Sequence, residues 1–264
     1  MTALDPSRLE AFGHQQGIPV EVFSEVNSTN TWLQNTPGTE LRMCFADTQT
    51  QGRGQRGRQW HSPPSDNIYF SCRYPFKAPA ATLAGLSLAV SVSLHRLLQA
   101  RLPGQPLAIK WPNDILCDTR KLAGILVELV TQPELTLAII GIGINVNMMP
   151  EAGQPISQAW TSLRQLTGHA MDRHLLCQDL IVALPATLQA FEATGLVSFL
   201  DAWQAADALR GQPITVQHNN RLFQGTAQGI DRQGRLVMET TDGWPMVFSS
   251  GEASLVPHRN TAFQ

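Results

Sequence analysis

Polar and glycine residues gather in four short stretches of the chain, and their types suit the binding of a small ligand with anionic and amide groups. The stretches are residues 28–30, 49–60, 110–121 and 141–145. The second reads Gln-Thr-Gln-Gly-Arg-Gly-Gln-Arg-Gly-Arg-Gln-Trp. Its glycines let backbone N–H groups approach an anion, and Arg53, Arg56 and Arg58 add guanidinium groups that bind anions in a forked geometry. We therefore expect an anion-binding loop here.

Gly52, Gly54 and Gly57 also match the G-x-G-x-x-G dinucleotide motif, which needs a helix that starts at its last glycine. Pro63 and Pro64 follow soon afterwards, and prolines prevent a helix from continuing there. The dinucleotide interpretation is therefore rejected. On this stretch alone, a solvated basic loop and a weak RNA-contacting segment remain open as alternatives to an anion site.

Strands are expected to deliver these stretches to the end of a sheet, where ligand sites in α/β proteins lie. Alternating apolar residues predict a strand over 20–26 and another over 42–48, which leads into the glycine loop. Between them, Asn27 or Ser28 can cap a short helix that extends through Leu33. The same patterns predict strands over 67–74, 107–111, 121–128 and 135–147, and a helix over 80–100.

Lys110, Asn113 and Asp114 crowd just past the strand over 107–111. An ordinary turn is the alternative, because Pro-Asn-Asp is common turn chemistry. Lys121 then stands at the mouth of an apolar run in which Gly124 leaves room for a ligand or a neighbouring backbone.

Gly141 and Gly143 remove side chains just before Asn145, whose amide could recognise a flat heterocycle such as adenine. A strand bulge packed on a helix is the alternative for the two glycines.

The composition is that of an ordinary globular protein. The 264 residues carry a formal net charge of -2, which argues against bulk electrostatic binding of nucleic acid. The four cysteines form no C-x-x-C pair, so neither a zinc site nor a dithiol motif is expected, and scattered thiols suit a reducing compartment. The N-terminus has no signal-peptide pattern, and the apolar region 83–98 falls short of the roughly 20 residues that span a bilayer. We therefore expect a cytoplasmic protein with no membrane contact.

The four stretches, in their order, resemble the signature of the biotin protein ligases. The matching pieces here are Ser28-Thr29-Asn30, the loop from Gln49 to Trp60, Lys-Trp-Pro-Asn-Asp from residue 110, Arg-Lys-Leu-Ala-Gly-Ile-Leu-Val-Glu from residue 120 and Gly-Ile-Gly-Ile-Asn from residue 141. The resemblance spans residues 22–256. It implies an α/β catalytic domain, with a mixed sheet and helices as in class II aminoacyl-tRNA synthetases, over 1–210, and a small SH3-like β-barrel over 211–264.

The C-terminal pattern agrees with this division independently. Apolar spacing predicts helices over 173–193, with a kink at Pro185, and over 197–206. After residue 211 come short alternating runs over 214–217, 221–230, 235–240 and 246–249, separated by turn residues, as in a small barrel.

The resemblance also implies roles for particular residues. Arg53, Lys121 and Asp114 would be catalytic. The residues implied for biotin are Ser28, Thr29, Asn30, Gln49, Gly52, Arg53 and Gly124. Those implied for ATP and the adenylate are Gln55, Arg56, Arg58, Trp60, Lys110, Asn113, Lys121, Gly143, Asn145 and Trp160. No metal-ligating residue is expected.

The implied reaction activates biotin with ATP and Mg²⁺ as biotinyl-5′-AMP and transfers it to a lysine of a biotin carboxyl carrier protein, a subunit of acetyl-CoA carboxylase. Too few residues precede the first strand for a DNA-binding domain, so no DNA binding is expected, whereas a homodimer is allowed. Gln55 departs from the family loop, which often has Arg there. Two rivals remain: a lipoate or octanoate ligase of the same fold, and a non-enzymatic RNA-binding protein that uses the basic loop.

Overall fold

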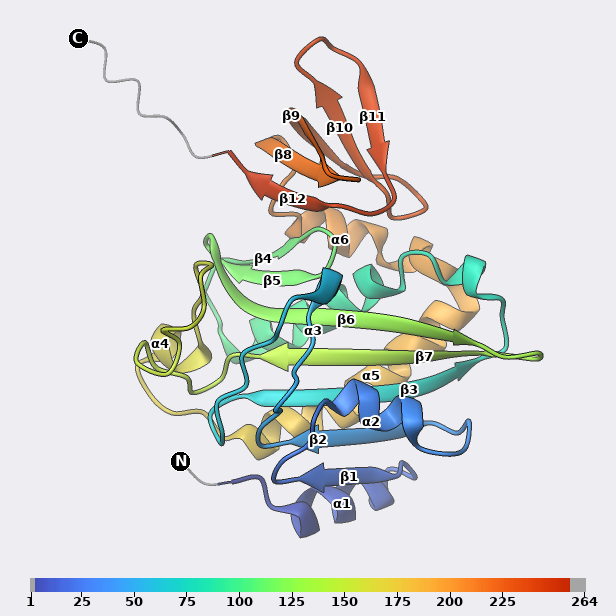
Figure 1. The fold of residues 1–264 in the computed structure, drawn as a ribbon, viewed down its shortest axis with the longest axis vertical. Coiled ribbons are helices and arrows are strands. Elements are labelled where there is room, and N and C mark those ends of the chain that lie inside the picture. The colour runs from blue at the N-terminus through green and yellow to red at the C-terminus, as the bar shows by residue number, and fades with distance from the viewer. Residues whose placement is uncertain (1–2, 257–264) are drawn as a thin grey trace.

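The computed structural model describes residues 3–256. Its larger part is built on a sheet of seven strands in the order β1-β2-β3-β7-β6-β5-β4 (Figure 1). The strands are β1 (Val20–Phe23), β2 (Arg42–Ala46), β3 (Ile68–Phe76), β4 (Leu107–Lys110), β5 (Asp114–Cys117), β6 (Arg120–Thr131) and β7 (Thr136–Ile144). β1 pairs with β2 in parallel, and the remaining neighbours are antiparallel. The mixed sheet predicted from the sequence is thus confirmed.

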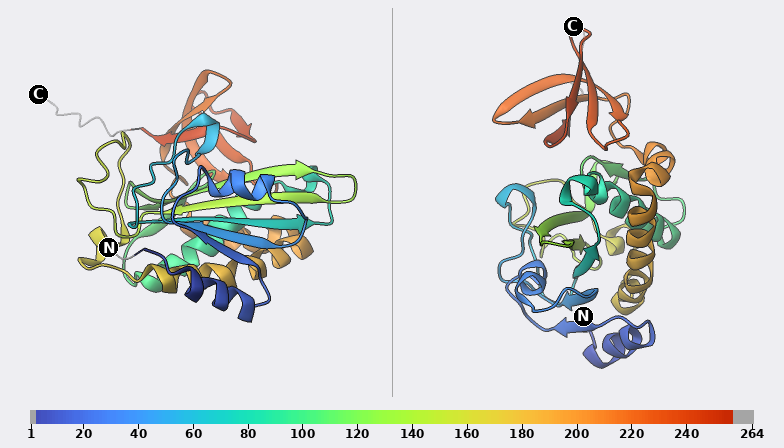
Figure 2. Two further views of the ribbon diagram at one scale, coloured as in Figure 1. Left: turned by 60° about the horizontal axis from the view of Figure 1, so that its bottom comes forward. Right: turned by 90° about the vertical axis from the view of Figure 1, so that its right-hand side faces the viewer.

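Helices cover the two faces of this sheet unequally. They are α1 (Pro6–Gln15), α2 (Thr29–Asn35), α3 (Leu86–Arg101), α4 (Leu163–Thr167), α5 (Arg173–Thr194) and α6 (Leu200–Ala206), with 3₁₀ turns η1 (Gln55–Gly57), η2 (Ala80–Leu83) and η3 (Gly195–Phe199). The long helices α3 and α5 pack on each other and on one face, and α2 lies on the other (Figures 1 and 2). The opposite face is therefore left open for a site.

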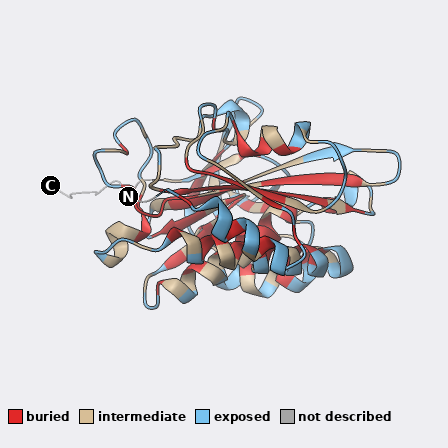
Figure 3. Cartoon of the chain, turned by 90° about the horizontal axis from the view of Figure 1, so that it is seen from below, coloured by how far each residue is buried: buried red, intermediate tan, exposed pale blue. Residues whose placement is uncertain are grey.

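Side-chain alternation along the strands explains why the two faces differ. Phe70, Ile140 and Ile142 belong to the main apolar core with the helices, and the central strands are buried along most of their length (Figure 3). Their neighbours along the strands, such as Ser71 on β3 and Gly141 on β7, are cross-strand partners and point to the other face. A strand that is buried on one side and carries small or polar residues on the other can line a cavity.

Three element boundaries differ from the sequence predictions. The helix expected over 80–100 begins only at Leu86, because Gly85, at φ 84°, separates it from η2. The helix expected over 197–206 is divided into η3 and α6. The stretch 110–114 contains the turn that was the alternative interpretation, and it joins β4 to β5. β5 was missing from the sequence prediction, and its first residue, Asp114, pairs with Lys110 of β4.

The smaller part is a five-stranded antiparallel sheet in the order β11-β10-β9-β8-β12. Its strands are β8 (Pro213–His218), β9 (Arg221–Ile230), β10 (Leu236–Thr240), β11 (Pro245–Phe248) and β12 (Glu252–Leu255). The small antiparallel domain expected after residue 211 is thus present, with β12 as an additional strand, and its SH3-like character stays a prediction. Trp111 Nε1 donates to the Gly234 carbonyl at 3.1 Å and joins the two parts. The domain boundary between residues 210 and 211 stays a prediction. Residues 257–264 of the expected domain lie outside the described part of the chain.

Two helical stretches, residues 80–101 and 173–206, are long and apolar enough to cross a membrane by length and composition alone. The first includes the region that the sequence analysis judged too short. About half of each apolar window, 50% and 44%, is buried within the protein, and α3 and α5 pack against each other. Such burial is typical of core helices.

A buried ion pair anchors α5 and the N-terminal segment to the end of β2. Asp47 Oδ1 lies 2.8 Å from Arg173 Nη2, with side chains only 7% and 4% exposed. The same carboxylate accepts the Leu4 backbone N–H at 3.1 and 3.0 Å. Asp47 also stands two residues before Gln49, so this anchor fixes the point from which the glycine loop departs.

We expect Asp47→Ala to lower the free energy of unfolding by about 3–5 kcal/mol, because it breaks the buried ion pair with Arg173. Urea unfolding followed by circular dichroism measures the change. Asp179→Ala is the matched control: its pair with Arg101 is 34% and 35% exposed, and surface pairs contribute only about 0–1 kcal/mol. Equal effects of the two substitutions would contradict the anchoring role.

Candidate active site

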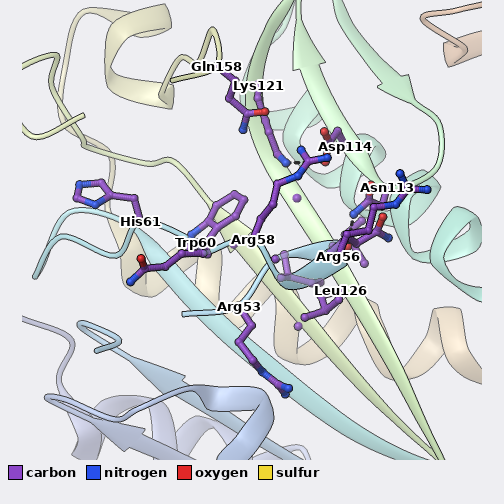
Figure 4. Close-up of a pocket in the computed structure, with 18 of the residues that line it drawn as sticks. Arg53, Arg56, Arg58, Trp60, His61, Asn113, Asp114, Lys121, Leu126 and Gln158 are labelled. Atoms are coloured by element: carbon purple, nitrogen blue, oxygen red, sulfur yellow. Dashed lines mark hydrogen bonds and ion pairs between the residues drawn. The ribbon is translucent and has the colours of Figure 1, made fainter. Parts of the chain in front are cut away.

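A cavity of about 600 Å³ opens on the face of the sheet that α3 and α5 leave uncovered (Figure 4). Its walls come from the N-terminus of α2, the glycine loop, strands β3 to β7, residues 155–160 and the start of β12. All but one of the residues predicted for the site line it, namely Ser28, Thr29, Asn30, Gln49, Arg53, Gln55, Arg56, Arg58, Trp60, Lys110, Asn113, Asp114, Lys121, Gly124, Gly143, Asn145 and Trp160. Segments as far apart in the sequence as Ser28 and Glu252 thus meet in one place.

Gly52 is the exception and does not line the cavity. A Cβ at this position would lie 2.6 Å from the Trp60 carbonyl oxygen and 2.9 Å from Ser62 Oγ. The Gly52 carbonyl accepts the Trp60 backbone N–H at 2.9 Å. Gly52 is therefore needed where the loop folds back on itself, and Gly54 takes its place in the cavity wall.

A cluster of buried charges forms one end of the cavity. Lys121 Nζ, at the start of β6, lies 2.7 Å from Asp114 Oδ1, at the start of β5, and both side chains are mostly buried. Burial lowers the pKa of the neighbouring Lys110, and the Lys121 charge adds to this effect while Asp114 opposes it. Two ammonium groups and one carboxylate leave an excess of positive charge, which suits an incoming anion.

Trp60 lies flat on the sheet between this charged end and the rest of the cavity. A Cβ at Gly143 would approach its ring to 2.4 Å, and one at Gly124 to 2.9 Å. Lys121 Nζ stands 5.3 Å from the ring centroid, within the range of a cation–π contact. The two glycines therefore make room for an aromatic ring of the chain itself. Within residues 3–256, the buried Trp60 Nε1 has no hydrogen-bond partner.

The three loop arginines contact different parts of the protein. Arg53 Nη2 pairs with Glu128 Oε2 at 2.7 Å and points away from Lys121 (Figure 4). Arg56 Nη1 donates to the Gln217 carbonyl at 3.5 Å, and the Arg58 guanidinium contacts the Glu252 carboxylate. Arg53 and Lys121, both expected to be catalytic, thus point apart in this arrangement, and two of the arginines contact the C-terminal domain.

Two side-chain amides predicted to face the ligand donate their hydrogen bonds to backbone carbonyls of the protein. Asn145 Nδ2 donates to the carbonyls of Lys121 and Thr161 at 3.3 and 3.0 Å, and Asn113 Nδ2 donates to the Ile125 carbonyl at 2.5 Å. Trp160 packs across Gly153, where a Cβ would lie 1.8 Å from its ring. Asn145 therefore fixes the segment that carries Trp160 beside Lys121.

Hydroxyl and amide groups form the other end. Ser28 caps α2, and the backbone N–H and hydroxyl of Thr29 donate to Gln49 Oε1 at 3.0 and 3.2 Å. Gln49 Nε2 in turn donates to Ser62 Oγ at 3.2 Å. Ser28, Thr29 and Asn30 are buried. Buried polar groups of this kind recognise a ligand by complementary donors and acceptors.

Several residues of the site were not predicted from the sequence. They are Ser71 on β3, Glu128 on β6, Ser62, residues 155–158 and Glu252 on β12. A signal existed only for Glu128, which is a charged residue within the apolar stretch 122–130 of β6. Glu252 is 194 residues from Arg58, and no local pattern links them.

A mixed sheet with buried ammonium groups at one end of a cavity and hydroxyl and amide groups at the other, followed by a small antiparallel domain, defines a ligase of the biotin and lipoate class. Residues 22–145 match the Biotin/lipoate A/B protein ligase family, and residues 210–256 match the Biotin protein ligase C terminal domain. The chain belongs to the biotin protein ligase family.

Relatives and solved structures agree with this assignment. The bifunctional ligase/repressor BirA of Escherichia coli (strain K12) is 35% identical over 250 residues, which cover 93% of this chain and 77% of that protein. The biotin--[acetyl-CoA-carboxylase] ligase of Paracoccus denitrificans is 32% identical over 228 residues, which cover 84% and 95% of the two chains. The structure of the biotin protein ligase from Aquifex aeolicus in complex with biotin and ATP is 27% identical, with a TM-score of 0.77, and covers 90% of this chain and 98% of that one.

The lowered pKa of Lys110 predicts how anion binding depends on pH. Because its pKa lies below that of an ordinary lysine, Lys110 loses its charge earlier as the pH rises, and the affinity of the cavity for a polyphosphate should fall. Lys110→Arg keeps its charge at all these pH values, so its binding should weaken less at alkaline pH. Calorimetric titration with ATP between about pH 7 and 10 measures both proteins. Lys77→Arg, at an exposed position, is the control, and parallel profiles for wild type and Lys110→Arg would overturn the prediction.

Proposed function

We propose that this protein is an ATP-dependent ligase that activates biotin as biotinyl-5′-AMP and transfers it to a lysine of a biotin carboxyl carrier protein. The observation that carries the proposal is one cavity with the buried Lys121 and Asp114 pair at one end and the Thr29 and Gln49 hydrogen bonds at the other. Biotin has a carboxylate at one end and a ureido ring at the other, so the cavity matches both ends of this substrate.

The proposed reaction has two steps. The biotin carboxylate attacks the α-phosphate of ATP, the bond to the β-phosphate breaks, and pyrophosphate leaves. A lysine amine of the carrier protein then attacks the acyl carbon of the mixed anhydride, AMP leaves, and the amine loses a proton. Both steps build negative charge on oxygens, and a buried ammonium stabilises such charge far better than water does.

Lys121 is the residue proposed to stabilise this charge. Its Nζ is mostly buried and already held by Asp114, so little reorganisation is needed when the anhydride forms. Asp114 would also orient, and take the proton from, the incoming lysine. Arg53 would take part once its ion pair with Glu128 is broken. Lys110, Arg56 and Arg58 would neutralise the charge of the phosphates.

The remaining residues would recognise the two substrates away from the reacting atoms. We assign Ser28, Thr29, Asn30 and Gln49 to the ureido ring, and Gly124 to the wall of the cavity on the biotin side. Adenine would lie near Trp160 and Asn145, with Asn113, Gly143, Gln55 and Trp60 around it. All of these residues line the cavity.

Mg²⁺ is proposed as a companion of the triphosphate. No group of three or more His, Cys, Asp and Glu side chains within residues 3–256 could hold a metal ion. The carboxylates of the cavity are engaged, since Asp114, Glu128 and Glu252 pair with Lys121, Arg53 and Arg58. The chain thus offers no dedicated cage, in keeping with the preference of Mg²⁺ for phosphate oxygens and water. When bound, the ion would neutralise phosphate charge.

We propose a cytoplasmic protein that acts on the carrier subunit of acetyl-CoA carboxylase, as the name of the Paracoccus denitrificans relative indicates for that protein. The absence of DNA binding and the formation of a homodimer stay predictions. A lipoate or octanoate ligase is less well supported, because those acids have no ureido group for the Thr29 and Gln49 end. An RNA-binding role is also less well supported, because the loop arginines contact Glu128, Gln217 and Glu252.

The first functional test is pyrophosphate exchange. The purified protein with ATP, Mg²⁺ and biotin should exchange labelled pyrophosphate into ATP, because adenylate formation is reversible. Lipoate or octanoate in place of biotin should give no exchange. If exchange follows lipoate or octanoate instead, the biotin assignment is wrong.

The second test concerns Lys121. Lys121→Ala should slow adenylate formation by about 10²-fold or more, as loss of one preorganised charge stabiliser usually does. Single-turnover quench with labelled ATP measures this step directly. Lys77→Ala removes an exposed lysine and should react at the wild-type rate. Full activity of Lys121→Ala would remove Lys121 from the proposed mechanism.

A further inference from the structure

A continuous series of hydrogen bonds runs beneath the hydroxyl end of the cavity and begins at Glu128. Its carboxylate oxygen Oε2 accepts from Asn30 Nδ2 at 2.7 Å. Asn30 Oδ1 lies 2.6 Å from Ser71 Oγ, and Ser71 Oγ lies 2.7 Å from Thr29 Oγ1. Thr29 Oγ1 lies 3.2 Å from Gln49 Oε1. We refer to these five residues as the Glu128 network.

The network is closed off from water at its centre. Ser71, Asn30 and Thr29 are 0%, 3% and 4% exposed, so each of their protons must be used within the network or by a ligand. Gly141 makes this packing possible, because a Cβ there would lie 2.5 Å from Asn30 Oδ1. Glu128 is thus joined to Thr29 by a chain of buried groups with no space for solvent to interrupt it.

The chemistry of a carboxylate decides the direction of these hydrogen bonds. Glu128 also pairs with Arg53, and a carboxylate accepts but does not donate. Asn30 must therefore turn its NH₂ group toward Glu128 and its carbonyl oxygen toward Ser71. Because that oxygen cannot donate, the single proton of the Ser71 hydroxyl is committed to Asn30.

The commitment of the Ser71 proton determines what Thr29 can offer to a ligand. With no proton coming from Ser71, the Thr29 hydroxyl uses its own proton inside the protein, toward Ser71 at 2.7 Å or Gln49 at 3.2 Å. No donor among the described residues then occupies either lone pair of the Thr29 oxygen, so this hydroxyl can act as an acceptor toward the cavity that it lines. A ligand with an N–H donor satisfies it, and a ligand without one leaves a buried acceptor unpaired, which is costly.

We propose that Glu128 is a positioning residue that sets Thr29 as a hydrogen-bond acceptor and so makes the pocket specific for a ligand with ureido N–H groups. The inference rests on the proposed function. It extends that function by assigning specificity to Glu128 and Ser71, which touch the network and not the reacting atoms.

Glu128→Gln tests the proposal because glutamine has nearly the same shape as glutamate but can also donate a hydrogen bond. The new amide can donate to Asn30, whose own amide then turns its NH₂ toward Ser71. Ser71 can then donate to Thr29, which occupies one of the two lone pairs of the Thr29 oxygen and releases the Thr29 proton toward Gln49 or the ligand, where it opposes a ligand N–H. We expect the KM for biotin in pyrophosphate exchange to rise about tenfold or more, the range for a buried polar mismatch, while the KM for ATP changes less than about twofold.

The preference of the protein for biotin over an analogue tests the role of Glu128 more sharply, because a purely structural role would not change that preference. Wild-type protein should strongly prefer biotin to an analogue methylated on its ureido nitrogens, which lacks the N–H donors. Glu128→Gln should reduce this preference, because it weakens recognition of the donors and not of the rest of the molecule. An unchanged ratio between the two ligands would overturn the proposal.

Ser71→Ala provides a second variant that leaves Glu128 and Arg53 intact. If Glu128 acts through Ser71, the double variant should bind biotin about as weakly as the weaker single variant, since coupled residues are not additive. Fully additive effects would overturn the proposal, as would equal changes in the KM values of biotin and ATP. Glu134→Gln, at an exposed position near the end of β6, should match the wild type.

The same assay separates the proposal from the function on which it rests. If wild-type protein gives no exchange with biotin, the proposed function fails. If wild-type protein is active and Glu128→Gln has the wild-type KM for biotin, only the role of Glu128 fails.

Discussion

The whole site depends on one constraint: a central sheet can line a cavity only where its side chains are removed. Gly124 and Gly143 are direct cross-strand partners on β6 and β7, and Gly141 pairs with Ser71 on β3. The Trp60 ring lies on Gly124 and Gly143, and the Asn30 amide lies on Gly141. A Cβ at any of these glycines would displace the group above it. The opposite face of the same strands carries the large apolar residues that pack on α3 and α5. Stability and binding are thus assigned to opposite faces of one sheet.

The cluster of Lys110, Lys121 and Asp114 has fixed positions and an excess of positive charge. Lys121 has one partner, Asp114, and Lys110 is disfavoured as an ion by burial. An arriving phosphate therefore replaces lost hydration with fixed charges, which is the condition under which electrostatic stabilisation is strong. The small C-terminal domain takes part, because its Glu252 contacts Arg58 of the glycine loop. This contact links the second domain to the wall of the cavity.

The hydroxyl end works by a different principle. There the protein does not supply net charge but a fixed pattern of donors and acceptors, and a buried group with the wrong pattern is penalised more than a correct one is rewarded. Glu128 can impose that pattern from outside the contact surface because Asn30 and Ser71 have no other orientation that satisfies them. In the proposed function, recognition of the ring and stabilisation of the anhydride would thus rest on separate residues of one pocket.

The sequence by itself determined the fold class and the family, and all but one of the site residues that it predicted line the cavity. Long local patterns carry such information, because apolar alternation predicts strands and because the loop and the Lys-Trp-Pro-Asn-Asp segment are contiguous motifs. It did not predict that Gly52 packs inside the loop, that Arg53 pairs with Glu128, or that β12 brings Glu252 to the site. These facts were decided only by the tertiary structure: the first depends on how the loop folds back on Trp60, and the other two on contacts between residues 75 and 194 positions apart. Hydrogen-bond direction and close approach are properties of atoms brought together by folding, and no local pattern encodes them.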